Sequence, residues 1–127
     1  MTRPDLIGLV ERYFAAVDAE DFQAIAAILV PDCVFSVETH GVRLEGIAAI
    51  EKMFARLWAD HAAVRHRDFI HVPDAEDGRI ASRFTVINTH HDGRQVHKSN
   101  CNFFEAVAGR FSRVAVYMEG ENTLEAA

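Results

Sequence analysis

The chain has 127 residues, of which half are hydrophobic and a quarter are charged, and its formal net charge is -6 at pH 7. This length and composition fit one globular domain spanning residues 1–127, and the acidic balance argues against a nucleic-acid partner, which would require a basic face. No apolar run reaches the length of a membrane span, and the first residues lack a signal-peptide pattern. The two cysteines, Cys33 and Cys101, are typical of a reducing compartment, so we expect a cytoplasmic protein without a disulfide framework.

Apolar residues in the first half recur at helical spacing and predict three helices. The first helix has an apolar face from Leu6 to Val17, and Pro4 suits its first turn. Asp21 can cap a second helix, which Pro31 ends. A short alternating strand at residues 33–39 and a returning segment at residues 41–46 precede the third helix. The apolar stripe of that helix consists of Ile47, Ile50, Met53, Phe54, Leu57 and Trp58.

The second half predicts four antiparallel strands. Alternating segments at residues 63–72, 79–91, 94–106 and 110–119 are separated by turns that contain Gly78, Gly93 and Gly109. Helices followed by hairpin-connected strands indicate the α+β class. We therefore expect three N-terminal helices packed in the concave face of a strongly curved antiparallel sheet.

Asn100 and Asn102 stand two residues apart within the third of these strands, so they share one face. A two-residue turn at residues 92–93 would put both on the outer face, whereas a three-residue loop at residues 91–93 would turn both inward. With a similar loop at residues 107–109, they share a face with Ile80, Phe84, Val86, Phe104, Val114, Val116 and Met118. Because this apolar face suits a cover of helices, we predict that both asparagines point inward, with Lys98 near the rim.

The strand at residues 63–72 raises the same question of orientation. Val64, Ile70 and Val72 form its more apolar face, and His66 and Asp68 share that face. We therefore predict that His66 and Asp68 also point inward. A buried polar group without a partner costs about 1–3 kcal/mol, so an ordinary core would not gather a histidine, an aspartate and two asparagines. A cavity for a small ligand explains the set.

Several strings resemble the nuclear transport factor 2-like superfamily, specifically its SnoaL-like and ketosteroid-isomerase-like members. The strings are RYFAAVDAEDFQAIAAILVPDCVF, LEGIAAIEKMF and GRFSRVAVYME, and the resemblance covers nearly the whole chain. It implies a cystatin-like cone, or α+β barrel, in which a bent sheet wraps around helices and leaves an apolar pocket at the open end. Members of the superfamily are commonly homodimers through the sheet. They include isomerases, dehydratases, cyclases and epoxide hydrolases, as well as non-catalytic binding or assembly domains.

The resemblance implies roles for several residues. Tyr13 stands where the isomerases have an oxyanion-hole tyrosine, and Asn102 stands where they have a protonated aspartate that donates a hydrogen bond. An amide also donates, and it needs no shifted pKa to do so. The position of the isomerase general base holds Val37, and the neighbouring Glu38 faces the other side. The resemblance therefore implies a pocket of the isomerase kind without the isomerase base.

His66 offers an alternative base, because dehydratase- and dehydrochlorinase-like members use a histidine from the corresponding strand, oriented by an aspartate. The catalytic residues expected on this basis are His66 as base, Asp68 as its orienting carboxylate and Tyr13 as a polarising donor. Asn102 would donate to the same oxygen, and Asn100 would orient the ligand. The further residues expected in the pocket wall are Val37, Met53, Trp58, Phe84, Val116 and Met118.

The sequence contains no HExxH or CxxC spacing, so we expect no metal, and acid–base chemistry needs no redox cofactor. The leading hypothesis is an acid–base enzyme of the isomerase, dehydratase or cyclase type that acts on a small, mostly apolar carbonyl or hydroxyl compound. The alternatives are a binding module with the same pocket and a dimeric assembly domain. We expect a homodimer through the outer sheet face, built on Cys101, Phe103, Ala115 and Tyr117, and neither a nucleic-acid nor a membrane partner.

Overall fold

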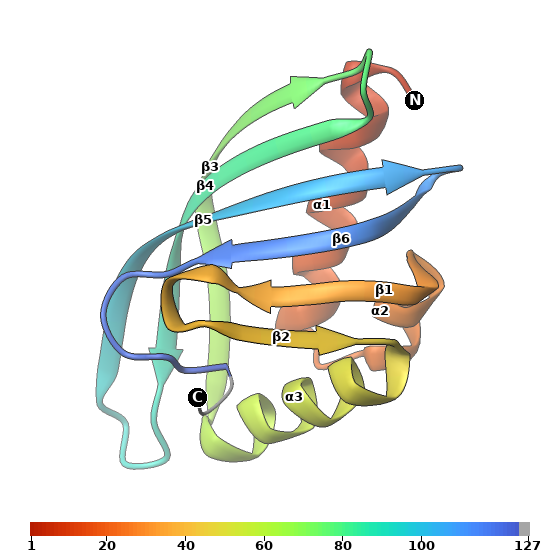
Figure 1. Cartoon of the computed structure of the whole chain (residues 1–127). Coiled ribbons are helices and arrows are strands. Elements are labelled where there is room, and N and C mark those ends of the chain that lie inside the picture. The colour runs from red at the N-terminus through yellow and green to blue at the C-terminus, as the bar shows by residue number, and fades with distance from the viewer. Residues whose placement is uncertain (125–127) are drawn as a thin grey trace.

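The computed structural model describes residues 1–124, and its elements form an α+β fold, as predicted (Figure 1). The helices are α1 (Arg3–Asp18), α2 (Phe22–Ala27) and α3 (Ile47–Asp60), with a short 3-10 helix η1 at Glu38–His40. The strands are β1 (Leu29–Val37), β2 (Val42–Glu45), β3 (Ala63–Asp74), β4 (Arg79–Thr89), β5 (Gln95–Val107) and β6 (Arg110–Tyr117). No helix among the described residues has the length and apolar character needed to cross a bilayer.

One curved sheet contains these strands in the order β2-β1-β6-β5-β4-β3. Neighbouring strands are antiparallel except β1 and β6, which pair in parallel, a pairing that the sequence did not predict. Figure 1 shows α1 lying behind the long strands on the concave side, while α3 lies across the lower end of the cone. Because β2 and β3 are both edge strands, the sheet is a cone that remains open and not a closed barrel.

Short-range signals begin the helices where the sequence places them. The Thr2 hydroxyl accepts a hydrogen bond from the backbone N–H of Asp5 (3.1 Å), and the Asp5 carboxylate accepts one from the backbone N–H of Thr2 (2.9 Å), which is a capping box. Asp21 caps α2 by accepting from the backbone N–H of Ala24. The apolar faces of α1 and α3 then pack with the inner face of the sheet in one hydrophobic core.

The register of the β4–β5 hairpin decides which way the two asparagines face. Ser82 pairs with Asn102 and Phe84 with Asn100, as the three-residue loop at residues 91–93 requires. Gly93 has a φ of 90°, the left-handed conformation that this loop needs. Asn100 and Asn102 are 6% and 3% exposed and lie on the inner face. The prediction that both asparagines point inward is confirmed.

The β5–β6 hairpin reaches the predicted face by a different route. Its turn consists of two residues, Ala108 and Gly109, which have positive φ values of 51° and 81°. The expected three-residue loop is therefore wrong here. A β-bulge shifts the register opposite residues 105–106 and restores the alternation, so that Asn102 still lies beside Val116.

A bulge also reverses the two faces of β3 halfway along the strand. The register with β4 shifts within residues 67–70, and Asp68 takes a positive φ of 60°. His66 lies before the bulge and keeps the predicted orientation. Beyond the bulge, Ile70 and Val72 are 52% and 65% exposed, whereas Phe69 packs against the core. The prediction that Asp68, Ile70 and Val72 face inward is therefore wrong.

Candidate functional site

A cavity lies between the helices and the concave face of the sheet. Of the residues predicted for the pocket, Tyr13, His66, Phe84, Asn100, Asn102, Val116 and Met118 line it. Its volume is about 40 Å³. This volume admits a few water molecules but is far below the roughly 300–1,000 Å³ of pockets that hold drug-sized ligands.

Three residues predicted for the pocket wall lie in or against the core and do not border the cavity. Val37 and Met53 are fully buried among other apolar side chains and do not border the cavity. The indole N–H of Trp58 donates to the backbone carbonyl of Val17 (3.1 Å), and the indole ring stacks on Phe54 at 5.5 Å between centroids. Trp58 therefore supports a wall residue without reaching the cavity itself.

The apolar wall contains residues that the sequence marked only as core. They are Phe14, Val17, Phe35, Phe54, Leu57, Val64 and Val86. Helical and strand periodicity identifies buried positions, but it does not say which of them border an unfilled space. None of the described residues that line the cavity is Lys, Arg, Asp or Glu. The lining therefore favours an uncharged, mostly apolar ligand.

His66 and Asp18 form a hydrogen-bonded pair at the edge of this cavity. The Nδ1 atom of His66 lies 2.6 Å from Oδ1 of Asp18, and Oδ2 of Asp18 accepts from the backbone N–H of His66 at 2.9 Å. A carboxylate can only accept, so the Nδ1 atom carries the proton and the Nε2 atom is the basic ring nitrogen. The side chains of His66 and Asp18 are only 9% and 19% exposed, which strengthens their attraction.

Aromatic neighbours fix the plane of the His66 ring. Phe14 lies 4.6 Å and Phe84 5.3 Å from it between ring centroids. Both phenylalanines also line the cavity. The imidazole is therefore held on one edge by a carboxylate and is flanked by two apolar rings, an arrangement suited to a general base.

Asp68, the residue predicted to orient His66, lies elsewhere. The bulge turns it to the surface, where its carboxylate is 3.5 Å from the guanidinium of Arg67. Asp18 takes the orienting position instead, and sequence reasoning missed it. Asp18 is the last residue of α1 and lies 48 positions before His66, so no local spacing connects the two.

Tyr13 reaches the cavity from the buried face of α1. It is 2% exposed, and the rings of Phe14, Phe54, Phe104 and Phe111 surround it at 5.0 to 6.4 Å. Burial raises the pKa of the Tyr13 phenol well above its ordinary value. The hydroxyl therefore stays protonated at every working pH and can act as a hydrogen-bond donor.

The polar groups on the strands differ in how well they are paired. Oδ1 of Asn100 accepts from the backbone N–H of Glu119 at 3.0 Å. Oδ1 of Asn102 and Nδ2 of Asn88 are buried without a partner, although both residues line the cavity. Asn88 was missed, yet it continues the inner-face alternation of β4 two residues beyond Val86. A ligand or water in the cavity could satisfy both orphaned atoms.

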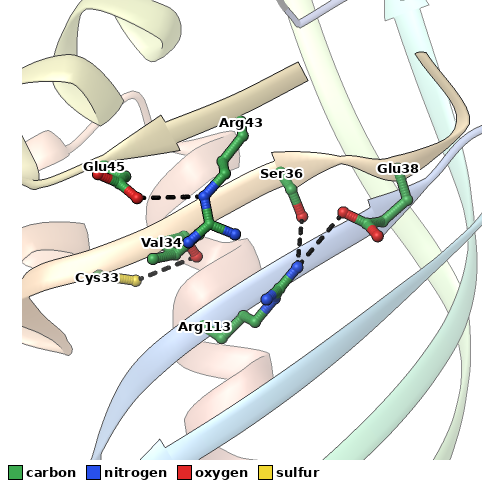
Figure 2. A network of polar contacts seen from close by, with 7 residues as sticks. All are labelled: Cys33, Val34, Ser36, Glu38, Arg43, Glu45 and Arg113. Carbon is green, nitrogen blue, oxygen red and sulfur yellow. Dashed lines mark hydrogen bonds and ion pairs between the residues drawn. The ribbon is translucent and has the colours of Figure 1, made fainter. Parts of the chain in front are cut away.

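Glu38 lies on the opposite side of the sheet from the cavity. Figure 2 shows the guanidinium of Arg113 between the Ser36 hydroxyl and the Glu38 carboxylate, each at 3.5 Å. Arg43 and Glu45 form a second ion pair nearby, at 3.2 Å. Glu38 therefore belongs to a polar network on the outer face and cannot replace the base that is absent at Val37.

Comparison with known proteins agrees with this architecture. A family model described as a SnoaL-like domain matches residues 10–114. No curated protein matches the chain. A candidate polyketide cyclase from Xanthomonas campestris pv. campestris is 24% identical, with a TM-score of 0.84 over 91% of this chain and 90% of that one.

Two further structures share the fold. A candidate polyketide cyclase from Pseudomonas putida KT2440 is 26% identical, with a TM-score of 0.74 over 86% of this chain and 87% of that one. A protein from Catenulispora acidiphila with a ketosteroid isomerase-like fold, in complex with trimethylamine, is 12% identical, with a TM-score of 0.77 over 86% of this chain and 83% of that one. The chain therefore belongs to the SnoaL-like domain family and has the cone fold that this family shares with ketosteroid isomerase-like proteins.

Proposed function

We propose that the chain is an acid–base enzyme that acts on a small, neutral, mostly apolar carbonyl or hydroxyl compound bound in the cavity. The observation that carries the proposal is the short contact between His66 Nδ1 and Asp18 Oδ1 (2.6 Å) at the edge of an apolar cavity. A histidine held in this way is a base suited to neutral pH. The chemistry needs no redox cofactor.

The first step of the proposed reaction is removal of a proton from the carbon beside a carbonyl. The Nε2 atom of His66 takes this proton, and the negative charge moves to the carbonyl oxygen. The Tyr13 hydroxyl and the Asn102 amide would stabilise that oxygen by donating hydrogen bonds. Asp18 would stabilise the imidazolium that results. Return of the proton from Nε2 to another carbon completes an isomerisation. Its transfer to a β-hydroxyl, which leaves as water while a carbon–carbon double bond forms, completes a dehydration. Attack of the enolate carbon on a second carbonyl, whose oxygen then takes the proton, completes the bond-forming step of a cyclisation.

The names of similar structures support this class of reaction. Two of them are described as candidate polyketide cyclases, and polyketide chains carry carbonyl groups beside acidic carbons. The absence of charged residues from the described cavity wall also favours a neutral carbonyl compound. The identity of the substrate depends on the shape of the cavity when a ligand occupies it.

Proton exchange at carbon tests the proposal without knowledge of the natural substrate. We expect the protein to accelerate the exchange of the α-protons of 1-indanone, a small neutral aromatic ketone, in deuterium oxide, as followed by proton NMR. The variant His66→Gln should lower this acceleration by about 10²–10⁴-fold, the usual contribution of a general base.

His97→Gln is the matched control, because His97 is an exposed histidine of β5 that lies outside the cavity. It should exchange the ketone at the wild-type rate. Equal rates for wild type and His66→Gln, with both proteins folded, would remove His66 from the mechanism.

A non-catalytic binding module is the second candidate, because the position of the isomerase base is the buried Val37. Trp58, the single tryptophan, stacks on the wall residue Phe54 and can report binding through its fluorescence. Saturable quenching by ketones that remain chemically unchanged, without any exchange of their α-protons, would favour this candidate over the enzyme.

The outer face of the sheet is the proposed site of a homodimer under either function. Phe103 and Tyr117 are 37% and 46% exposed there, beside their cross-strand partners Ala115 and Cys101. The face also carries charges of both signs, Arg113 and Glu38 among them, so that it can complement itself across a twofold axis.

Light scattering tests the homodimer, and a mass twice that of the chain at micromolar concentration is expected. The variant Tyr117→Asp should give the mass of a single chain. Val107→Asp changes a more exposed apolar residue at the end of the hairpin and should keep the doubled mass. A wild-type protein with the mass of one chain would contradict the dimer.

A further inference from the structure

The chain beyond β6 returns over the sheet and contributes to the cavity. Figure 1 shows it turning back after β6 toward the end of the cone near α3. Thr123 and Leu124 line the cavity, although both come after the last strand. We propose that residues 119–124, called here the cover, form a movable lid that must open before a ligand enters. This inference rests on the proposed ligand-binding role of the cavity.

Two inner-face side chains of β5 hold the cover closed, and between them the backbone N–H of Ser99 donates to the Glu119 carboxylate at 3.0 Å. Oδ1 of Asn100 accepts from the backbone N–H of Glu119 at 3.0 Å. The ammonium group of Lys98 donates to the backbone carbonyl of Glu121. Lys98 is only 6% exposed, which is unusual for a lysine and shows that the cover encloses it. Lys98, which the sequence predicts to point inward, thus helps to hold the cover closed and is called here the latch.

The latch lies in the same cross-strand row as the proposed base. Lys98 pairs with Val86 of β4, and Val86 pairs with His66 of β3. Side chains in one row share a face of the sheet, so the cover is fastened level with His66. Opening of the cover would therefore expose the part of the cavity where the chemistry is proposed to occur.

The cover itself has the features of a segment that opens easily. The described residues 118–124 belong to no helix or strand, so no ladder of hydrogen bonds must break. Gly120 has a φ of 70° where the chain turns over Lys98. Leu124 is only partly buried against the core. Segments with few backbone bonds open locally at a much lower free energy than global unfolding.

The small volume of the cavity gives a reason for opening. At about 40 Å³ it leaves little room for an aromatic ketone, and movement of the wall that contains Thr123 and Leu124 would enlarge it. The Nδ2 atom of Asn88 is buried without a partner in the same wall as Thr123 and Leu124. This amide therefore offers a hydrogen-bond donor to a ligand beside the wall that the cover completes.

Amide hydrogen exchange tests the motion without any ligand. We expect the amides of residues 119–124 to exchange through local opening, at least about tenfold faster than the central amides of β5. Lys98→Ala removes one hydrogen bond to the cover, and Leu124→Ala removes the apolar contact of the cover with the core. Each variant should therefore accelerate exchange of the Glu119 amide by roughly three- to tenfold. Lys52→Ala and Val107→Ala, at exposed positions outside the cavity lining, should leave it unchanged.

Binding kinetics test whether the cover controls entry. The probe is 1-aminoanthracene, a neutral aromatic amine whose fluorescence rises in apolar surroundings, mixed with the full chain by stopped flow. Because opening precedes both entry and release, Lys98→Ala and Leu124→Ala should raise the association and dissociation rates in parallel. Lys98 does not line the cavity, so the Kd of Lys98→Ala should stay within about twofold, since the equilibrium does not depend on the barrier. Leu124 lines the cavity, so the Kd of Leu124→Ala also includes the loss of its contact with the probe, and only its rates test the cover. A purely structural effect of Lys98→Ala would instead change its Kd.

The two measurements separate the lid from the ligand site. If the amides of residues 119–124 exchange only through global unfolding, the cover does not open locally, and the lid proposal is wrong whether or not a ligand binds. Binding of the probe at rates that neither variant changes would also overturn it, while the proposed ligand site would stand. Local opening together with an absence of binding in every variant would support a mobile segment but contradict the ligand site on which its function depends.

Discussion

Asp18 holds His66 through both of its carboxylate oxygens, one on the imidazole Nδ1 atom at 2.6 Å and one on the backbone N–H at 2.9 Å. The first contact selects the tautomer of the ring, and the second fixes the strand that carries it. The last residue of α1 thereby determines the position and orientation of the proposed base.

The substitution Asp18→Asn should reduce both stability and activity. An asparagine offers only one acceptor and turns an N–H toward one of the two donors of His66, so at least one hydrogen bond to a charged group is lost. We expect the free energy of unfolding to fall by about 2 kcal/mol, as measured by denaturation with urea. The exchange of 1-indanone α-protons should slow at least tenfold.

Asp60→Asn is the control for this substitution. Asp60 also ends a helix, α3, and is exposed, so its replacement should leave stability the same or slightly higher because a negative charge leaves a helix C-terminus. Equal stability changes at the two positions would mean that the contact between Asp18 and His66 contributes nothing.

The neighbouring asparagines should respond to leucine in opposite directions. Oδ1 of Asn102 is buried without a partner, so Asn102→Leu should raise the free energy of unfolding by about 1 kcal/mol while it weakens binding of 1-aminoanthracene or slows exchange of the ketone. Oδ1 of Asn100 accepts from Glu119, so Asn100→Leu should lower the free energy of unfolding by about 1 kcal/mol.

Urea denaturation of the two variants measures this difference, and each variant controls for the other because both place leucine on the same face of β5. A loss of stability in Asn102→Leu as large as that in Asn100→Leu would show that its amide is satisfied, for example by a buried water. If Asn102→Leu instead raises the free energy of unfolding and lowers activity, Asn102 is a functional residue that destabilises the fold when no ligand is bound.

Burial of the Tyr13 phenol makes stability depend on pH in the alkaline range. The pKa of Tyr13 is raised above its ordinary value of 10.0, so the unfolded phenol ionises first. The contribution is fully present below pH 10 and is lost as the pH rises from there toward the higher pKa of the folded state, by about 1.4 kcal/mol per pH unit. Tyr13→Phe should lack this part of the decline.

The contribution of Tyr13 is the difference between the free energies of unfolding of the wild type and Tyr13→Phe, measured by denaturation between pH 9 and 11. Cys33, whose pKa burial raises to about 12, contributes a decline of the same sign to both proteins, and its charge adds to the rise in the Tyr13 pKa. Tyr117→Phe changes a 46% exposed tyrosine and should retain the wild-type slope. Parallel curves for the wild type and Tyr13→Phe would contradict the burial of the phenol.

The sequence predicted the features that depend on short-range patterns. Helical periodicity and capping residues gave the three helices, and the loop at residues 91–93 gave the inward direction of Asn100 and Asn102. The apolar periodicity of the first helix placed Tyr13 inward and the alternation of residues 63–72 placed His66 inward, and both border the cavity. These positions follow from alternation or periodicity within a single element.

The features that the sequence did not predict depend on contacts between distant elements. Asp18 meets His66 only because α1 crosses β3, and neither residue marks the other in the sequence. The parallel pairing of β1 with β6 is equally non-local. The bulge in β3 was missed because its left-handed residue is Asp68, where a glycine would have suggested it.

Replacement of Asp68 by glycine tests the corrected view of β3. Asp68 has a φ of 60°, a conformation that costs a residue with a Cβ atom about 1 kcal/mol relative to glycine. The carboxylate is exposed, and its ion pair with the exposed Arg67 contributes little. We therefore expect Asp68→Gly to raise the free energy of unfolding by about 0.5–1 kcal/mol and to leave ketone exchange unchanged. Asp68→Val, which is β-branched and poorly suited to positive φ, should instead destabilise the fold. A large loss of exchange activity in Asp68→Gly, with stability retained, would return Asp68 to the site and displace Asp18 from its proposed role.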